Sequence, residues 1–225
     1  MPEAPVVLYE RRGPVAYVTM NRPRCRNAQN RAMTCALDDA FYRAADDPEV
    51  KVAVLAGAGQ HFSAGHDIGT PERDAHLPFE RRAGLWWDPS GRAGAESRFA
   101  RESDPGVEYF AHPWAMPPRI AKEFLYTGDR TPARRAYELG VANRVVGRAE
   151  LADETGRPAL RTAEIPGFGL ALPKRAVNRA EDLQGLHTGM DSAFGLHHLA
   201  HAHNAEKAAD SLGGMNTAAM KEANT

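Results

Sequence analysis

The distribution of apolar residues predicts three β-strands near the start of the chain. Residues 6–9 and 15–20 are rich in β-branched and aromatic side chains and flank a turn at Gly13-Pro14, a pattern typical of a β-hairpin. Residues 50–55 form a short and nearly continuous apolar run, which predicts a buried strand.

Between the second and third of these strands, the apolar positions follow a helical period. Over residues 30–45 they form one stripe, which consists of Met33, Leu37, Ala40, Phe41 and Ala44. Asn30 is suited to cap the start of this helix, and Pro48 ends it. A hairpin followed by a helix and a buried strand favours a layered α/β fold.

The rest of the chain is predicted to be mainly helical. Residues 70–104 contain no valine or isoleucine, so we expect either a surface excursion with a helix at 95–102 or a disordered loop. Further helices are expected over residues 120–125, 132–139, 158–163, 173–185 and 190–210, with a short extended segment at 141–146.

Composition narrows the class of protein. The 225 residues are 43% hydrophobic and 25% charged, which allows a core of good size, and the net charge of −1 argues against nucleic acid or an anionic membrane as a partner. The only cysteines are Cys25 and Cys35, so a reducing cytoplasm is the expected setting. No signal peptide or membrane-spanning run is expected.

Three segments, in this order, carry a resemblance to a known family. They are residues 20–28 (MNRPRCRNA), 52–68 (VAVLAGAGQHFSAGHDI) and 126–146 (YTGDRTPARRAYELGVANRVV). Together they are similar to the enoyl-CoA hydratase/isomerase (crotonase) family. The resemblance implies a crotonase-like α/β core of layered β-β-α units at residues 1–150 and a C-terminal helical region at 151–225. It also implies a homotrimer or a dimer of trimers.

The second segment carries the chemistry that the resemblance implies. A thioester enolate needs preorganised N–H donors near the developing negative charge, and small residues let a substrate approach the backbone. In the family, the alanine of this motif gives one of two oxyanion N–H groups, and that position is Ala64. The alternative for Ala64 is an ordinary tight turn.

The residues that follow Ala64 are also candidates for the substrate site: Gly65, His66, Asp67 and Ile68. His66 either polarises a carbonyl or lines the pocket as a polar residue. Asp67 is expected to fix the loop through backbone hydrogen bonds.

Candidate contacts for the coenzyme A moiety lie in the first segment. Family positions corresponding to Arg24, Arg26 and Ala28 lie against coenzyme A, and guanidinium groups bind phosphate well. The alternative for both arginines is a solvated surface position. Lys174 is predicted to begin a helix, where it either contacts phosphate or is solvated. Coenzyme A would be part of the substrate, so no separate cofactor is expected.

The resemblance fails at a seam near residues 103–105. Family members carry further residues there, including the second oxyanion N–H and two glutamates used in hydration. Either residues have been omitted from the sequence or the polypeptide is truly shorter; omission is favoured, because a real deletion would remove buried core. Glu108 is the nearest replacement acid, or else a surface residue. For the chain as it stands, we expect little hydratase activity.

Hydration of a 2-enoyl-CoA is the default reaction, with isomerisation and hydrolysis of an acyl-CoA as alternatives within the family. A protein of another class is also considered, because His197 and His201 would share one helix face as metal ligands do. We prefer a helix face that packs in the fold or against another subunit, and predict no metal site.

Overall fold

The computed structural model describes residues 4–67, 70 and 110–208, apart from the side chains of His198, His201 and Ala208. The chain divides into two compact units. One contains residues 1–105 and 153–171, and the other contains residues 106–152 and 172–225. The predicted boundary near residue 150 stays a prediction. The seam, Ile68, Glu108 and the helix expected at 95–102 lie outside the described residues.

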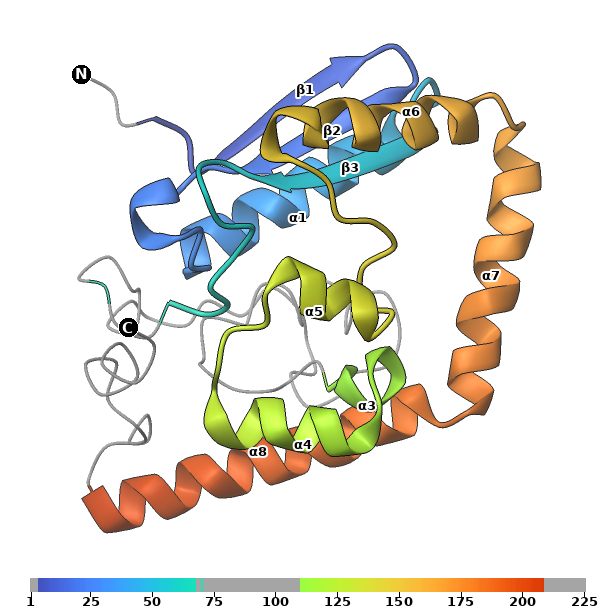
Figure 1. The fold of residues 1–225 in the computed structure, drawn as a ribbon. Coiled ribbons are helices and arrows are strands. Elements are labelled where there is room, and N and C mark those ends of the chain that lie inside the picture. Colours follow the sequence, from blue (N-terminus) through green and yellow to red (C-terminus); the bar gives the residue numbers. More distant parts are fainter. Residues whose placement is uncertain (1–3, 68–69, 71–109, 209–225) are drawn as a thin grey trace. The chain divides into compact units, whose positions relative to one another are not determined.

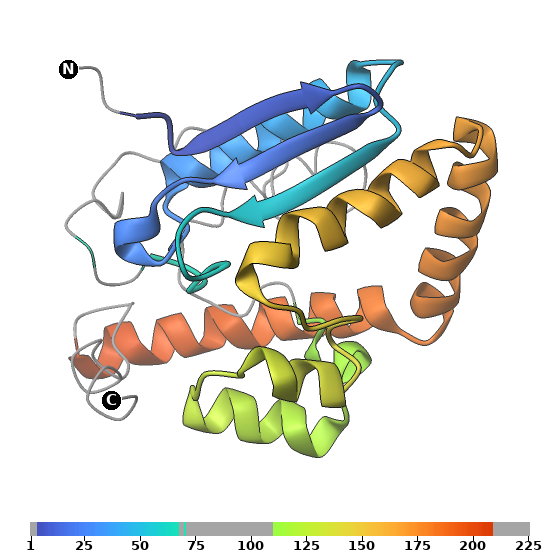
Figure 2. The same cartoon turned by 45° about the horizontal axis from the view of Figure 1, so that its top comes forward.

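The first unit is built on a three-stranded sheet in the order β1-β2-β3 (Figure 2). Strand β1 (Val7–Arg12) pairs antiparallel with β2 (Val15–Met20), and β2 pairs parallel with β3 (Val52–Gly57). Gly13 has a φ of 58° in the turn between the first two strands. The predicted hairpin is therefore confirmed.

Helix α1 (Arg31–Asp46) lies between β2 and β3 in the chain, as predicted, and packs against β1 and β2. The side chain of Asn30 accepts a hydrogen bond from Met33 N at 3.1 Å, which satisfies one of the free N–H groups of the first turn. Met33, Ala40 and Ala44 are buried, but Leu37 is only half-buried and Phe41 is 39% exposed, so two of the five residues of the predicted stripe are not buried.

The prediction that the third strand is buried was wrong. β3 is half-buried at best, and Leu55 is 39% exposed. The reason is its place in the sheet: β2 is the central strand, with four of its residues buried, whereas β3 pairs with β2 alone among the described residues. A strand at such an edge has neighbours on one side only.

Helix α6 (Leu151–Ala163), which joins the first unit from Asp153 onward, also lies against the sheet. Lys51 Nζ, just before β3, donates to the carbonyl of Ala163 at 2.9 Å. In Figure 1, α1 runs behind the sheet and α6 passes in front of it. The helix starts well before the predicted residue 158, and Pro158 lies inside it.

The second unit is helical among its described residues. Its helices are α3 (His112–Ala115), α4 (Pro118–Thr127), α5 (Ala133–Glu138), the 3₁₀ turn η2 (Arg148–Glu150) and α8 (Leu186–Ala208). α3 packs against α4. The segment at 141–146, which was expected to be extended, forms no strand.

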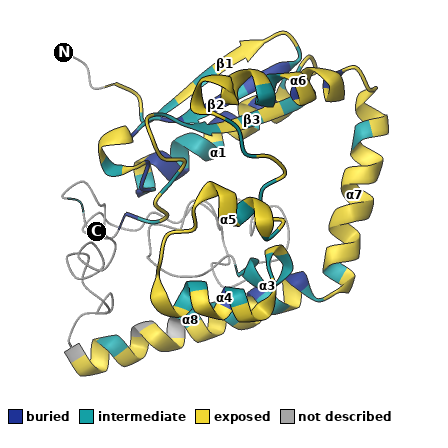
Figure 3. Ribbon diagram, in the orientation of Figure 1, coloured by how far each residue is buried: buried dark blue, intermediate teal, exposed yellow. Residues whose placement is uncertain are grey.

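Helix α7 (Gly167–Leu183) runs from one unit into the other and has no buried residue (Figure 3). It begins earlier than the predicted residue 173, so Pro173 is an internal helix residue. None of the helices in the described part of the chain is long and apolar enough to cross a membrane.

Candidate functional site

The candidate site begins where β2 ends. The chain passes through the short 3₁₀ turn η1 (Pro23–Cys25) and then through two consecutive residues with positive φ, Arg26 at 53° and Asn27 at 54°. Asparagine tolerates this left-handed conformation better than most residues, whereas arginine gains nothing from it. The two residues reverse the chain before α1 starts.

Asn27 connects this turn to the loop that follows β3. The residue is fully buried, and its Oδ1 accepts a hydrogen bond from Arg22 N at 2.9 Å. Its Nδ2 lies 2.9, 2.8 and 3.0 Å from the carbonyl oxygens of Ala58, His61 and Phe62. One side chain thus holds two loops that lie far apart in the sequence.

Gly57, the last residue of β3, makes this close approach possible. A Cβ at that position would lie 2.4 Å from the carbonyl oxygen of Phe62, 2.7 Å from that of His61 and 2.8 Å from Asn27 Nδ2. Real Cβ atoms do not come this close to backbone oxygens. The loop can therefore fold back over the end of the strand only with glycine here.

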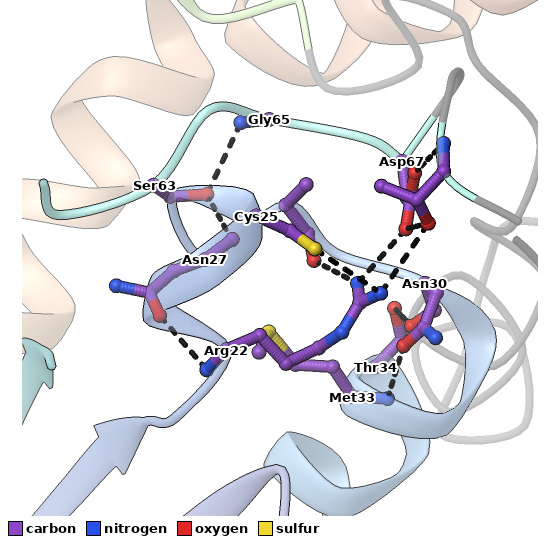
Figure 4. Close-up of polar contacts among 11 residues, drawn as sticks. Arg22, Cys25, Asn27, Asn30, Met33, Thr34, Ser63, Gly65 and Asp67 are labelled. Atoms are coloured by element: carbon purple, nitrogen blue, oxygen red, sulfur yellow. Dashed lines mark hydrogen bonds and ion pairs between the residues drawn. The ribbon is translucent and has the colours of Figure 1, made fainter. Parts of the chain in front are cut away.

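Ser63 ties the next part of the loop to the same turn (Figure 4). Its Oγ donates to the backbone carbonyl of Asn27 at 2.9 Å and accepts a hydrogen bond from Gly65 N at 3.1 Å. Gln29 N donates to the carbonyl of Gly65 at 2.8 Å, and Asp67 N donates to the carbonyl of Gln29 at 2.9 Å. These bonds form a short parallel bridge at Gln29 and His66.

A buried ion pair closes the arrangement. Arg22 Nη1 lies 2.9 Å from Asp67 Oδ2, and the two side chains are 7% and 1% exposed (Figure 4). The same guanidinium donates to the carbonyl of Ala28 at 2.6 Å. Burial opposes ionisation of Asp67, but hydrogen bonds from Thr70 and the charge of Arg22 outweigh it, so the pKa of Asp67 is lowered.

Ala64 lies between these fixed points. It is exposed, and within the described part of the chain its backbone N–H has no hydrogen-bond partner. Its neighbours Ser63 and Gly65 are both held by hydrogen bonds to the turn before α1. The arrangement presents one unpaired donor on a constrained backbone, which is one of the features that binding of a developing oxyanion needs.

The structure sorts the other predicted site residues by exposure. Arg24 and Arg26 are exposed, and no acidic partner is found for either among the described residues. Ala28 is 7% exposed and thus buried, as is the ion-paired Asp67. His66 is half-buried and takes part in the bridge to Gln29.

Lys174 does not begin a helix, contrary to the prediction. α7 starts at Gly167, so Lys174 lies about two turns into it and is exposed. Its N–H is no longer one of the free donors of a helix start. Lys174 also belongs to the second unit, whereas Ala64 and the two arginines belong to the first.

No cluster of three or more histidine, cysteine or carboxylate side chains that could hold a metal ion is found among the described residues. The side chain of His201, one of the two suggested ligands, is outside that set. The metal-binding alternative therefore remains untested.

Sequence reasoning missed the residues that build the site. Arg22, Gln29 and Ser63 carry no local signal, because each acts through contacts with residues far along the chain. Asn27 had one: asparagine before a helix start, after a turn, is a residue type that accepts positive φ. Its partners 31 to 35 positions away could not be inferred from that signal.

Comparisons with known proteins agree with the resemblance. Residues 10–82 match the family model described as enoyl-CoA hydratase/isomerase. EchA13 of Mycobacterium tuberculosis, whose name describes an enoyl-CoA hydratase, is 32% identical in an alignment 249 residues long, which includes 85% of this chain and 78% of that protein. A carnitinyl-CoA dehydratase of Salmonella enteritidis is 29% identical over 77% of this chain and 80% of its own length.

Among solved structures, a probable enoyl-CoA hydratase of Mycobacterium smegmatis matches with a TM-score of 0.73 and 33% identity, over 92% of this chain and 98% of its own. The crotonase-like α/β fold is therefore confirmed. The alignment with EchA13 is longer than the part of this chain that enters it, so that relative carries residues with no counterpart here.

Proposed function

Because the chain belongs to the enoyl-CoA hydratase/isomerase family, we propose that it is a hydratase-type enzyme that binds an acyl-CoA thioester and stabilises the enolate of that thioester at Ala64 N. The observation that carries this proposal is the unpaired N–H of Ala64 between two residues held by hydrogen bonds.

The physical argument rests on preorganisation. A backbone N–H that is already oriented stabilises negative charge on the thioester oxygen without rearranging when the charge appears. The bonds of Ser63 and Gly65 restrict the backbone on both sides of Ala64. The same donor serves hydration, isomerisation and hydrolysis, since each passes through an oxyanion.

Hydration of a 2-enoyl-CoA is the reaction we propose first. The names of the relatives, enoyl-CoA hydratase and carnitinyl-CoA dehydratase, both describe the addition or removal of water. The acid and base for that step stay unassigned, since Glu108 lies outside the described residues. Slow turnover by this chain remains our expectation, as do isomerisation and hydrolysis as alternatives.

Coenzyme A binding is assigned to Arg24 and Arg26 under this proposal. Both guanidinium groups are exposed, both lie directly after β2, and both belong to the unit that contains Ala64. Planar guanidinium groups can bind the phosphates of coenzyme A with paired hydrogen bonds. We further propose a cytoplasmic homotrimer, or a dimer of trimers, that needs no separate cofactor.

The test compares two ligands that differ at the carbonyl. Acetyl-CoA has the thioester oxygen, whereas S-ethyl-CoA, a thioether, lacks it. Isothermal calorimetry should show about 3- to 10-fold tighter binding of acetyl-CoA, the effect of about one hydrogen bond. Ala64→Pro, which removes the N–H, should abolish this preference, whereas Ala64→Gly should retain it.

Equal affinity for the two ligands in the unmodified protein would refute the oxyanion assignment. No binding of either ligand would refute the coenzyme A assignment as well. Loss of enoyl absorbance with crotonyl-CoA then measures hydration directly. Stoichiometric zinc in the purified protein, lost in His197→Ala, would instead support the metal-binding alternative.

A further inference from the structure

We infer that Asn27 is a positioning residue, which sets the orientation of the Ala64 N–H through its grip on the loop after β3. The inference rests on the proposed function, because it concerns the same donor. Asn27 itself is buried and cannot reach a substrate. Its role would be exerted through the backbone that it holds.

The side-chain amide of Asn27 faces more acceptors than it has hydrogens. Three carbonyl oxygens, those of Ala58, His61 and Phe62, lie within 3.0 Å of Nδ2, which carries two N–H groups. At least one hydrogen is therefore shared between two acceptors. Three carbonyls that would otherwise repel one another are held together at a single nitrogen.

The opposite end of the same side chain fixes Asn27 in turn. Its Oδ1 accepts the hydrogen bond from Arg22 N at 2.9 Å, so the amide cannot flip without losing both sets of bonds. Arg22 is itself held by Asp67. The orientation of the donor group thus follows from the end of β2, which lies at the centre of the sheet.

The backbone of Asn27 continues the grip to the next loop residue. Its carbonyl accepts a hydrogen bond from Ser63 Oγ at 2.9 Å. Side chain and backbone of one residue therefore hold the loop at Ala58, His61, Phe62 and Ser63, up to the position before Ala64. Loss of the side chain releases the loop at Ala58, His61 and Phe62, while Ser63 stays attached to the Asn27 carbonyl and Gly65 stays attached through Gln29.

A matched pair of variants separates this role from general stability. Asn27→Gly removes the side chain but keeps access to the positive φ of 54°. Asn30→Gly makes the same chemical change three residues along, at the buried cap of α1, where the side chain accepts a hydrogen bond from Met33 N. Asn27→Asp, which keeps the acceptor for Arg22 N and loses the donors, is a second variant should the glycine variant fail to fold.

Two measurements are made on each full-length variant. Calorimetry gives the ratio of affinities for acetyl-CoA and S-ethyl-CoA. Isotope-edited infrared spectroscopy of acetyl-CoA labelled at the thioester carbonyl gives its stretching frequency, which a hydrogen-bond donor lowers. A role in stability alone would change neither quantity in the folded protein.

We expect the unmodified protein and Asn30→Gly to prefer acetyl-CoA about 3- to 10-fold and to lower the carbonyl frequency. Asn27→Gly and Asn27→Asp should lower the ratio and move the frequency toward its value in water, because the loop before Ser63 is no longer held. If either folded Asn27 variant keeps both the affinity ratio and the lowered carbonyl frequency, the inference about Asn27 is wrong and the proposed function still stands. Absence of both signals in the unmodified protein overturns the proposed function, and the inference with it.

Discussion

The ion pair between Arg22 and Asp67 should be among the most sensitive points of the first unit. In Arg22→Met, the Asp67 carboxylate would remain in place with a side chain only 1% exposed and no cation beside it. Removing one partner of a buried pair costs about 3–5 kcal/mol, because the remaining charge is left without compensation. Hydrogen bonds from Thr70 N and Oγ1 remain, so we expect the lower end of that range.

The pH dependence identifies the cause. In the unmodified protein the pKa of Asp67 in the folded state is below its ordinary 3.8, so the pair contributes stability that is complete above 3.8 and is lost as the pH falls through the lower folded value. In Arg22→Met, burial without the cation favours the protonated acid. The difference in stability between the two proteins should therefore shrink as the pH approaches 3.8 from neutrality.

The assay must report on the first unit, because a chain of two units need not unfold in one step. Urea titration with hydrogen-exchange mass spectrometry of peptides from β2 meets this need, since β2 lies at the centre of the sheet. Arg22→Lys serves as the control, because lysine keeps the positive charge but lacks the planar guanidinium group and its paired N–H donors. A loss below about 1 kcal/mol for Arg22→Met, or a loss that is the same at both ends of the pH range, would refute the reasoning.

Three further results are expected. Gly57→Ala should destabilise the first unit by about 1–3 kcal/mol through contact with the loop carbonyls, whereas Gly156→Ala, in α6 of the same unit with only an ordinary contact to Tyr17 Oη at 3.7 Å, should be neutral or stabilising in the same urea titration. Replacing Arg24 and Arg26 together with alanine should weaken acetyl-CoA binding about 10-fold or more by calorimetry, and unchanged affinity would contradict their assignment to phosphate. Burial lowers the pKa of His112, so the folded state loses stability as the pH falls below 6.5. The melting temperature of His112→Phe should not show this loss at low pH. An equal fall in the melting temperatures of both proteins would contradict the role of His112.

Local patterns predicted the elements that local forces determine. The helical stripe and the cap at Asn30 predicted both ends of α1 to within one residue, and the turn at Gly13 predicted the hairpin. The order of the strands in the sheet could not be predicted from local patterns, because it depends on pairing between distant parts of the chain. Leu55 looked like a core residue because its run is apolar, yet its exposure depends on which strand takes the centre of the sheet.

Proline misled the prediction of helix starts. Pro158 and Pro173 were taken as first-turn residues, the place where proline is best tolerated in a helix, but both are internal. For α6 a better signal was present in Asp153 and Glu154, which are acidic residues in the first turn and favour the positive end of the helix dipole.

The sequence indicated the segment that contains the candidate site, but not the hydrogen bonds and the ion pair that hold this segment in place. Ala64 was singled out because the segment after the third strand resembles the family motif, and such a motif is read from consecutive residues. The contact between Arg22 and Asp67 spans 45 positions, and nothing in either neighbourhood indicates it. Polar residues that hold a loop from a distance are found only when the fold brings them together.

Arg26 has a consequence for how this protein can change over time. It stands at a φ of 53°, where glycine would fit without penalty, and its side chain is exposed. Arg26→Gly should therefore be more stable by up to about 1 kcal/mol. A lineage that still used coenzyme A would keep the strained arginine, whereas one released from that ligand would be free to drift toward the relaxed glycine.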